Sequence, residues 1–271
     1  MSTPNLQSRP NRPPPRLMEV KRVMHLTPRM VRVTFGGADL AGVTVEGPAT
    51  HLKLFLPVEG QTVPLLPTFG ADGIRWPEGP RPVVRTYTPR AIRSEASELD
   101  VDFFLHADGP ASRWAANAQP GDCAGMAGPS KSVYAIPPDA RAFVLAGDES
   151  AIPAIQTILE ALPNGARAEV LLEVEDASDE QGLSTAAEVR VTWLHRGHAP
   201  GREGELLAKT LEDLELSPDA NYWVACEATQ VRAIRRTLLG EQGVNPARLV
   251  TRGYWKQATA NHPDHDDGTD A

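Results

Sequence analysis

The sequence predicts a six-stranded antiparallel β-barrel followed by an α/β domain built on a parallel sheet, and three observations support this fold class. The chain has 271 residues, a length that suits two domains of about 100–150 residues each. Short β-branched or alternating segments dominate as far as Gly128, as they do in small barrels. After Pro129, strand-like and helical segments alternate, which is the pattern of a parallel sheet with crossover helices.

The elements of the barrel follow one another from Leu17. The stretch LMEVKRVMHLTPRMVRVTF holds two β-branched segments separated by Thr27 and Pro28, which predicts a strand, a turn and a strand. A Pro/Gly-rich insertion covers 57–82, and PASRWAANA from Pro110 predicts a short helix, because proline suits the first helical turn. Further strands are predicted at HLKLFLP, VVRTYT and ELDVDFFLH.

The second half supplies the parallel sheet. Its loops at the carboxyl ends of strands carry Gly147, His195, Glu227 and Gly253, and ligands of such sheets bind at that edge. The predicted strands are AFVLAG, ARAEVLLEVE, VRVTWLH, NYWVACE and LVTRGYW, separated by helices in DESAIPAIQTILEAL, GELLAKTLEDL and ATQVRAIRRTLLGEQG.

We place the barrel domain at 16–130 and the α/β domain at 131–257. The flanking segments 1–15 and 258–271 are polar and rich in Pro or acidic residues, so we expect disordered tails. Two histidines of the second tail, His262 and His265, could bind metal weakly, but an unstructured tail explains them more simply, and we expect no metal site.

Charge and composition exclude several classes of protein. The net charge is −8, which disfavours a nucleic-acid binder, because phosphate contacts need clustered Lys and Arg. The two cysteines, Cys123 and Cys226, are too few for an iron–sulfur cluster. The N-terminus has no apolar signal region and the chain has no run of about 18 apolar residues, so we expect a cytoplasmic protein without a membrane span, and a monomer.

The first chemical motif is Arg85-Thr86-Tyr87-Thr88-Pro89-Arg90. A strand tyrosine beside a hydroxyl residue, with arginines on either flank, suits a flavin nucleotide. The ring can stack on the isoalloxazine, Thr88 can hydrogen-bond its polar edge, and Arg can neutralise the pyrophosphate. When the motif stands alone, an edge strand with exposed arginines and a packed tyrosine explains it equally well.

The second motif runs from His106 to Trp114 and places Gly109 and Pro110 at the start of a helix, with Ser112 in its first turn. Backbone N–H groups at such a helix start favour a diphosphate. The alternative is a plain capped helix with Trp114 in the core, and His106 either faces a flavin or is a buried, hydrogen-bonded histidine.

Together these motifs resemble the siderophore-interacting protein family, a branch of the ferredoxin-reductase-like flavoproteins. RTYTPR and VDFFLHADGPASRWA resemble its FAD-binding domain. VLAGDESAIPAIQTILEALP, VTWLHRGHAPG and YWVACEATQVRAIRRTLLGEQGVNPARLVTRGYWK resemble its C-terminal domain. The likeness covers residues 17 to 257, with the motifs in the expected order.

The resemblance implies a site for FAD and for NADPH or NADH. It places the nicotinamide near Glu227, where Cys226 departs from the glycine of many members and is best explained by packing. Arg196 follows a strand end and could pair with a 2′-phosphate, which favours NADPH slightly, or could be an exposed loop arginine. The implied FAD residues are Arg85, Thr86, Tyr87, Thr88, His106, Asp108, Gly109, Pro110, Ala111 and Ser112, and Gly147, Asp148, Glu149 and Ser150 close over the dinucleotide.

The resemblance also implies a ferric-siderophore pocket near the flavin. Such complexes are bulky and often anionic, so cations should gather there. The candidates are Lys53, Lys131, Arg252 and Lys256, each of which is individually more typical of an ordinary surface charge.

The implied function is a ferric-siderophore reductase that passes electrons from NAD(P)H through FAD to Fe(III) and releases Fe(II). Flavin suits this task because it accepts two electrons and releases them singly, and no catalytic acid or nucleophile is required. The alternatives are a general flavin or ferredoxin-type reductase serving a protein partner, and a siderophore-binding protein without turnover.

Overall fold

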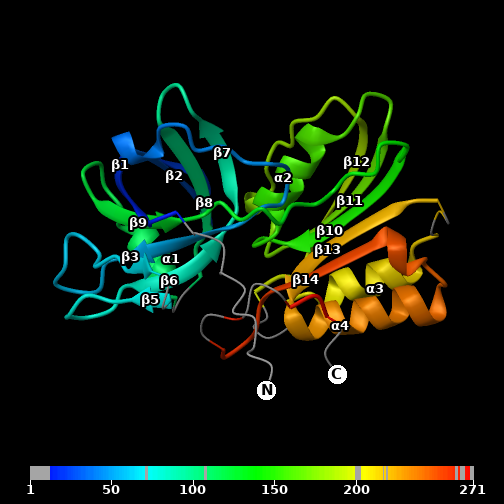
Figure 1. The fold of residues 1–271 in the computed structure, drawn as a ribbon. Coiled ribbons are helices and arrows are strands. Elements are labelled where there is room, and N and C mark those ends of the chain that lie inside the picture. Colours follow the sequence, from blue (N-terminus) through cyan, green and yellow to red (C-terminus); the bar gives the residue numbers. More distant parts are fainter. Residues whose placement is uncertain are drawn as a thin grey trace, which may run out of the picture.

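A computed structural model describes residues 13–70, 73–106, 109–198, 203–215, 217, 219–259, 262 and 266–268. Two lobes lie side by side, each built on its own sheet (Figure 1). Among the described residues, no helix is both long and apolar enough to cross a membrane.

The first lobe is a strongly curled antiparallel sheet of seven strands in the order β6-β3-β9-β1-β2-β8-β7. Its inner face buries one apolar cluster that includes Val33, Phe35, Leu54 and Phe103, as alternating strands require. The strands are β1 (Arg16–Thr27), β2 (Met30–Gly36), β3 (Leu52–Leu56), β6 (Val83–Tyr87), β7 (Pro89–Arg93), β8 (Glu98–Phe104) and β9 (Cys123–Ala127).

The predicted barrel is confirmed as a curled antiparallel sheet, but the count of six strands is wrong. The strand predicted at VVRTYT forms as β6, but a further strand that was not predicted, β7, begins at Pro89, and β6 and β7 are the two edges of the sheet. Pro89 has no N–H to donate to a strand ladder, and the register between β7 and β8 is irregular between Pro89 and Ala91. Consecutive strands at opposite edges mean that the sheet curls almost into a closed barrel.

Smaller elements complete the first lobe. The insertion at 57–82 contains a hairpin, β4 (Thr68–Gly70) with β5 (Gly73–Arg75). The predicted short helix is α1 (Pro110–Ala116), which begins with its proline and buries Ala111, Ser112 and Ala115. Trp114 stacks on Phe35 with the ring centroids 6.0 Å apart, so its assignment to packing is confirmed. A 3-10 turn covers Ala38–Leu40.

The second lobe is a parallel sheet of five strands in the order β12-β11-β10-β13-β14. Helix α2 covers one face, and α3 and α4 cover the other (Figure 1). The elements are β10 (Ala142–Asp148), α2 (Ile152–Ala161), β11 (Arg167–Val174), β12 (Glu188–His195), α3 (Glu205–Asp213), β13 (Asn221–Glu227), α4 (Ala228–Arg236) and β14 (Leu249–Trp255), with 3-10 turns at Ala177–Asp179 and Pro246–Arg248 and a π-helical turn at Thr237–Glu241.

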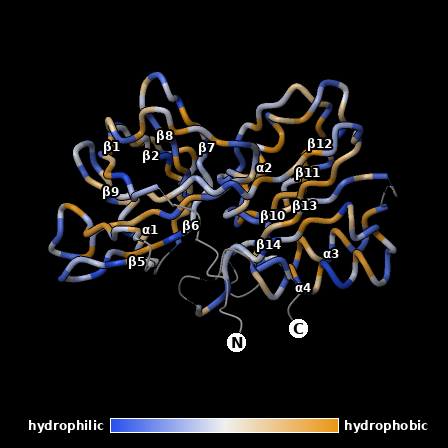
Figure 2. The backbone as a smooth tube through the Cα atoms, in the orientation of Figure 1, coloured by the Kyte–Doolittle hydropathy of each residue, from blue (hydrophilic) through white to orange (hydrophobic). Residues whose placement is uncertain are grey.

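The two faces of this sheet form separate apolar cores, and hydropathic colouring shows β10, β11 and β13 as its apolar centre (Figure 2). Near the end of the central strand, position 147 requires a glycine, because a Cβ there would lie 2.5 Å from the Cβ of Ala151 and 2.7 Å from the carbonyl oxygen of Ala225. Cys226 is fully buried in the core beneath α3 and α4, and burial raises the pKa of its thiol well above the ordinary value. These placements agree with a packing role for Cys226.

Two groups of ion pairs join the lobes. Arg29, in the turn between β1 and β2, donates from Nε to Asp179 (2.7 Å) and from Nη2 to Asp176 (2.8 Å), both after β11. Arg90 on β7 bonds Gln156 (2.6 Å) and Glu160 (2.5 Å) of α2. Since each arginine reaches from one domain to the other, these pairs fix how the two sheets face each other.

Part of the C-terminal segment for which we expected disorder makes defined contacts. Asp266 is 7% exposed, its backbone carbonyl accepts a hydrogen bond from the N–H of Gly253, and its carboxylate accepts from Arg232 at 2.7 Å. His262 lies 2.8 Å from the same carboxylate. His265 lies outside the described residues.

Candidate functional site

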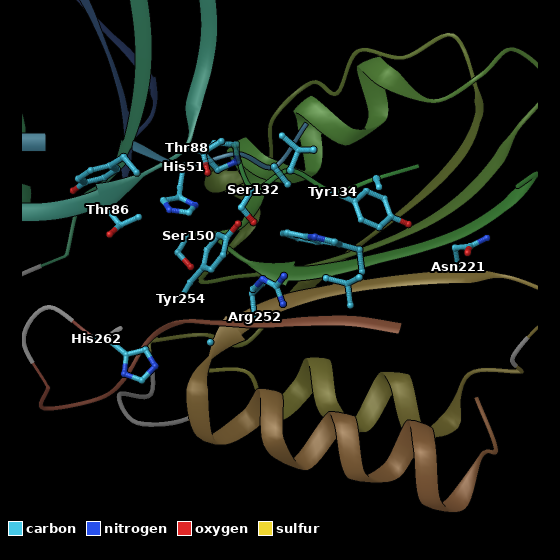
Figure 3. A pocket seen from close by; sticks show the side chains of 18 of the residues that line it. His51, Thr86, Thr88, Ser132, Tyr134, Ser150, Asn221, Arg252, Tyr254 and His262 are labelled. Carbon is cyan, nitrogen blue, oxygen red and sulfur yellow. The ribbon is translucent and has the colours of Figure 1, made fainter. Parts of the chain in front are cut away.

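A cavity of about 390 Å³ lies where the two lobes meet. Thr86, Tyr87 and Thr88 line it from the end of β6, while Ser150 and Arg252 line it from the parallel sheet. Figure 3 shows the labelled side chains around it, with His51 and Thr86 at one end and Asn221 at the other. The first motif therefore lies at the junction of the two domains.

Tyr87 links the cavity to the barrel core. Its ring packs on Phe103 at a centroid distance of 4.4 Å, and burial raises its phenolic pKa above the ordinary range. The ring is thus held by the core while it also lines the cavity. This geometry suits a side chain that supports a planar ligand.

Tyr254 on β14 faces the same cavity from the second lobe and is hydrogen-bonded to Thr88. Burial raises its pKa to about 12, so the hydroxyl stays protonated at neutral pH. This bond ties the carboxyl end of the parallel sheet to the point where β6 passes into β7.

Hydroxyls and cations supply the polar groups at the outer end of the cavity. Lys53, which pairs with Thr86 across β3 and β6, donates from Nζ to the Thr86 hydroxyl at 2.7 Å. Arg252 lines the cavity directly. Of the other predicted cations, Lys131 is 90% exposed at its side chain, one residue before the lining residue Ser132, and Lys256 is exposed beyond the end of β14.

The described residues of the second motif lie beside the barrel wall and do not line the cavity. The Ser112 hydroxyl accepts from the backbone N–H of His106 (2.8 Å) and donates to the His106 carbonyl (2.7 Å), so it holds the loop before α1. His106 is exposed, and its ring lies 6.3 Å from that of Phe104. A Cβ at position 109 would lie 2.3 Å from the His106 ring, so a larger residue there would require the exposed His106 side chain to move. Asp108 lies outside the described residues.

Three strands of the parallel sheet carry a buried carboxylate at or next to their last residue, and each carboxylate accepts backbone hydrogen bonds. Asp148 accepts from Ser150 N–H (3.0 Å) and from Trp255 Nε1 (2.7 Å). Glu173 accepts from the N–H groups of Gly204 and Leu207 at the start of α3. Glu227 accepts from Thr229 and Gln230 at the start of α4. Burial raises the pKa of Asp148 and Glu173.

Glu149 and Arg196 form a buried ion pair beside these carboxylates. Arg196 Nη2 lies 2.7 Å from Glu149 Oε1, and the two side chains are 8% and 4% exposed. Burial raises the pKa of Glu149 to about 7, although Arg196 acts in the opposite direction. Arg196 is therefore neither an exposed loop arginine nor a free cation in this structure.

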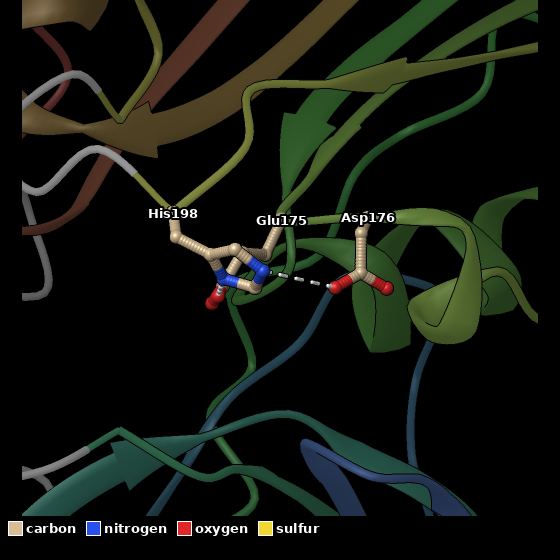
Figure 4. Close-up of side chains that lie close together, drawn as sticks. All are labelled: Glu175, Asp176 and His198. Atoms are coloured by element: carbon tan, nitrogen blue, oxygen red, sulfur yellow. Dashed lines mark hydrogen bonds and ion pairs between the residues drawn. The ribbon is translucent and has the colours of Figure 1, made fainter.

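A second polar cluster follows β11 at the same edge of the sheet. His198 contacts Glu175 and lies 3.9 Å from Asp176 (Figure 4). The guanidinium of Arg29 lies 3.2 Å from Glu175 and 2.8 Å from Asp176. A cation of the protein already balances these carboxylates, so the cluster serves as part of the junction between domains.

The cavity brings together only some of the predicted site residues. Arg85 lies on β6 with Nη1 directed to the Val84 carbonyl, and Glu227, Gly147, Asp148 and Glu149 lie at the strand ends behind the lining. Sequence reasoning missed several lining residues that carry no local motif, namely His51, Ser132, Tyr134, Asn221, Trp223 and Arg248. Tyr254, which also lines the cavity, follows the predicted Arg252 by two residues on the same strand.

The outer end of the cavity fits an isoalloxazine by its donor set. It combines the Tyr87 ring with the side chains of Thr86, Thr88 and Ser150, a flat apolar surface edged by groups that can donate or accept hydrogen bonds. Tyr87, Thr86 and Thr88 would hold the ring system.

The fold and this cavity define a ferredoxin-reductase-like protein with two domains. The same fold occurs in the ferredoxin reductase of carbazole 1,9a-dioxygenase, with a TM-score of 0.67 over 89% of this chain and 69% of that one at 15% identity. Residues 19–133 match the siderophore-interacting FAD-binding domain, and residues 140–258 match the siderophore-interacting protein model. The chain belongs to the siderophore-interacting protein family.

Relatives with higher sequence identity support the same family assignment. The chain is 34% identical to the ferric vibriobactin reductase ViuB of Vibrio cholerae serotype O1 over 93% of both chains. It is 34% identical to the NADPH-dependent ferric-chelate reductase of Escherichia coli strain K12, over 89% of this chain and 92% of that one. A siderophore utilization protein from T. fusca has 39% identity and a TM-score of 0.84, over 94% and 98% of the two chains.

Proposed function

We propose that this protein is an FAD-dependent reductase that takes electrons from NAD(P)H and delivers them to ferric-siderophore complexes, releasing Fe(II). The observation that carries the proposal is the cavity lined by Thr86, Tyr87 and Thr88 from one domain and by Ser150 and Arg252 from the other. The names of the two reductases to which the chain is 34% identical support the same reaction.

The barrel residues would bind and orient the flavin. Tyr87 would support the ring, Thr86 and Thr88 would meet its polar edge, and Arg85 with the segment from His106 to Ser112 would contact the pyrophosphate. Bound FAD supplies the ability to take two electrons as a hydride and to release them singly. One NAD(P)H therefore reduces two ferric ions, with release of one proton.

The donor site would lie at the carboxyl edge of the parallel sheet. Gly147, Asp148, Glu149 and Ser150 would face the dinucleotide, with Glu227 near its nicotinamide. NADPH is the proposed donor because one relative is named for it. Arg196 would contact the 2′-phosphate only after leaving Glu149, to which it is paired at 2.7 Å.

The acceptor site would use the cations around the outer end of the cavity. Arg252 lines it, and the ammonium of Lys53 touches the lining residue Thr86. Lys131 and Lys256 would extend this positive rim. Since the net charge of the whole chain is −8, an anionic complex has to be recognised by such a local group of cations. We propose that the protein acts as a monomer in the cytoplasm.

The test begins with the absorption spectrum of the purified protein. We expect a flavin band that NADPH bleaches without oxygen and that ferric-siderophore complexes restore, with Fe(II) captured by a ferrous chelator. A protein without flavin that still binds the complexes would instead be a carrier. A flavin that NADPH reduces, but that no ferric complex reoxidises faster than oxygen does, would identify a general flavin reductase.

A further inference from the structure

The buried carboxylate of Asp148, at the end of β10, receives hydrogen bonds from two parts of the α/β domain. Asp148 is 2% exposed. Its Oδ1 accepts from the backbone N–H of Ser150 at 3.0 Å and from the Ser150 hydroxyl, and its Oδ2 accepts from Nε1 of Trp255 at 2.7 Å. Since β13 lies between β10 and β14, the indole of Trp255 reaches across the end of β13 to hold this carboxylate in place.

These bonds decide the polarity of the Ser150 side chain. Backbone and indole N–H groups can only donate, so both oxygens of Asp148 serve as acceptors. The N–H groups and the positive charge of Arg196 favour the carboxylate form of Asp148, in opposition to burial, which raises the pKa of the group. A hydroxyl has one hydrogen and two lone pairs. Because the Ser150 hydroxyl gives its hydrogen to Asp148, it presents lone pairs to the cavity that Ser150 lines (Figure 3).

The same local arrangement recurs in an exposed turn, where it has no such effect. Asp176 accepts from the N–H of Ser178 at 2.8 Å and from the Ser178 hydroxyl at 2.6 Å. Ser178 is exposed, and the Asp176 side chain is 39% exposed, so water competes for both groups. Asp148 is shielded from that competition, and burial therefore fixes the direction of the Ser150 hydroxyl.

An acceptor at this place suits the carboxamide of a nicotinamide ring. Ser150 lines the cavity from the parallel sheet, whereas Tyr87 lines it from the barrel. The NH2 group of a carboxamide has two hydrogens to donate. A phosphate oxygen would need the hydrogen that Ser150 gives to Asp148, and it would approach the negative charge of that carboxylate. The chemistry of Ser150 therefore favours an amide N–H over a phosphate.

We infer that Asp148 and Trp255 are positioning residues, which hold Ser150 as a hydrogen-bond acceptor for the carboxamide N–H of the nicotinamide. The inference rests on the proposed function and concerns one part of its donor site. Hydride transfer requires a defined alignment of the two reacting carbons. A hydrogen bond to the carboxamide limits how the nicotinamide ring can turn, and so contributes to that alignment.

The test compares the binding of two dinucleotides to the FAD-loaded protein by calorimetry at about pH 8.5. NADP⁺ carries the carboxamide, and its 3-acetylpyridine analogue carries a methyl ketone, which has no N–H. Ser150→Ala should raise the Kd of NADP⁺ about fivefold, as loss of one hydrogen bond predicts, and should leave the Kd of the analogue unchanged. Ser150→Thr retains the hydroxyl and should keep the wild-type ratio of the two Kd values.

Asp148→Asn and Trp255→Phe test the positioning residues. The amide of Asp148→Asn can donate to the Ser150 oxygen, which frees the Ser150 hydrogen to point into the cavity. The ratio of the Kd of NADP⁺ to that of the analogue should then rise about fivefold or more. Trp255→Phe removes one hydrogen bond to Asp148 and should raise this ratio by a smaller factor. A merely structural role would raise both Kd values equally. Ser178→Ala is the matched control and should change neither Kd.

The possible outcomes separate this inference from the proposed function. If Ser150→Ala binds both dinucleotides with the wild-type ratio, the inference is overturned and the proposed function stands. Weaker FAD retention in that variant at an unchanged ratio also overturns it, because Ser150 would then accept from an N–H of the flavin. If neither dinucleotide binds to the wild-type protein, the proposed donor is wrong and the inference fails with it.

Discussion

Tyr87 belongs to two environments, since its ring packs on Phe103 in the barrel core and also lines the cavity between the domains. Tyr87→Ala should therefore weaken FAD retention by about 1 kcal/mol or more, since it removes a stacking surface. The measurement is flavin absorbance after dialysis against a series of FAD concentrations. Tyr87→Phe keeps the ring and is the control. Full flavin occupancy in the alanine variant would contradict this placement of the isoalloxazine.

Glu149 and Arg196 make stability depend on pH in a defined direction. A carboxyl group with a raised pKa in the folded state favours the protonated form. The free energy of unfolding therefore falls as the pH rises from the pKa of the group in the unfolded chain, near 4.5, through its pKa in the folded protein, about 7. Arg196→Met removes the opposing positive charge and should raise the pKa of Glu149 further. Above that pKa, the free energy of unfolding of the variant should be lower than that of the wild type by about 1.4 kcal/mol for each pH unit of the shift.

Denaturant unfolding at pH 5.5 and pH 8.5 checks this expectation. The deficit of Arg196→Met should be larger at pH 8.5, whereas Arg167→Met, at an exposed ion pair, should show little change at either pH. A deficit that is equal at both values would mean that Glu149 does not titrate in this range.

The residues of the site differ in how far the sequence reveals them. Thr86, Tyr87 and Thr88 are consecutive residues at the end of β6, so a local motif was enough to predict them. Arg196 was expected to be free or exposed, because nothing near it in the sequence shows that Glu149, 47 positions earlier, shares its buried site. Asn221 carries no local signal, since one polar residue at a strand start is common.

Among the elements, the turn between β1 and β2 supplies Arg29, one of the two arginines that join the domains. Arg29→Gln would leave Asp179, which is 2% exposed, without the guanidinium that donates to it at 2.7 Å. We expect a loss of about 2 kcal/mol in the free energy of unfolding, since a buried carboxylate loses its partner. Chemical denaturation followed by tryptophan fluorescence measures the change.

Arg190→Gln is the matched control for this prediction. Arg190 pairs with Glu169 at 2.6 Å, but its side chain is 76% exposed, and exposed pairs contribute little. If both variants lose the same free energy, the turn does not stabilise the junction.

The elements themselves follow from local pattern. All three predicted helices of the α/β domain form as α2, α3 and α4, because apolar residues recur at helical spacing in each. The strand β7 was missed, because it begins with a proline, and a proline fits a strand only when that strand is known to lie at an edge of the sheet.

At the scale of the whole molecule, the two domains were predictable and their junction was not. The change from strands to alternating strands and helices marks the two sheets in the sequence. The contacts that orient these sheets join residues far apart, such as Arg29 with Asp179 and Arg90 with Glu160. No periodicity in the chain encodes such pairs, so the cavity between the domains appears only in three dimensions.

The buried carboxylates at the strand ends bear on how long each nucleotide would stay bound. The carboxylates of Glu173 and Glu227 already accept hydrogen bonds from the backbone N–H groups at the starts of α3 and α4. A phosphate approaching either helix start would therefore meet a negative charge and no free N–H group. Within the described part of the α/β domain, α2 is the one helix whose first turn donates no backbone hydrogen bond to a carboxylate. A pyridine nucleotide should accordingly have a short residence time and exchange at every turnover, while the flavin remains resident.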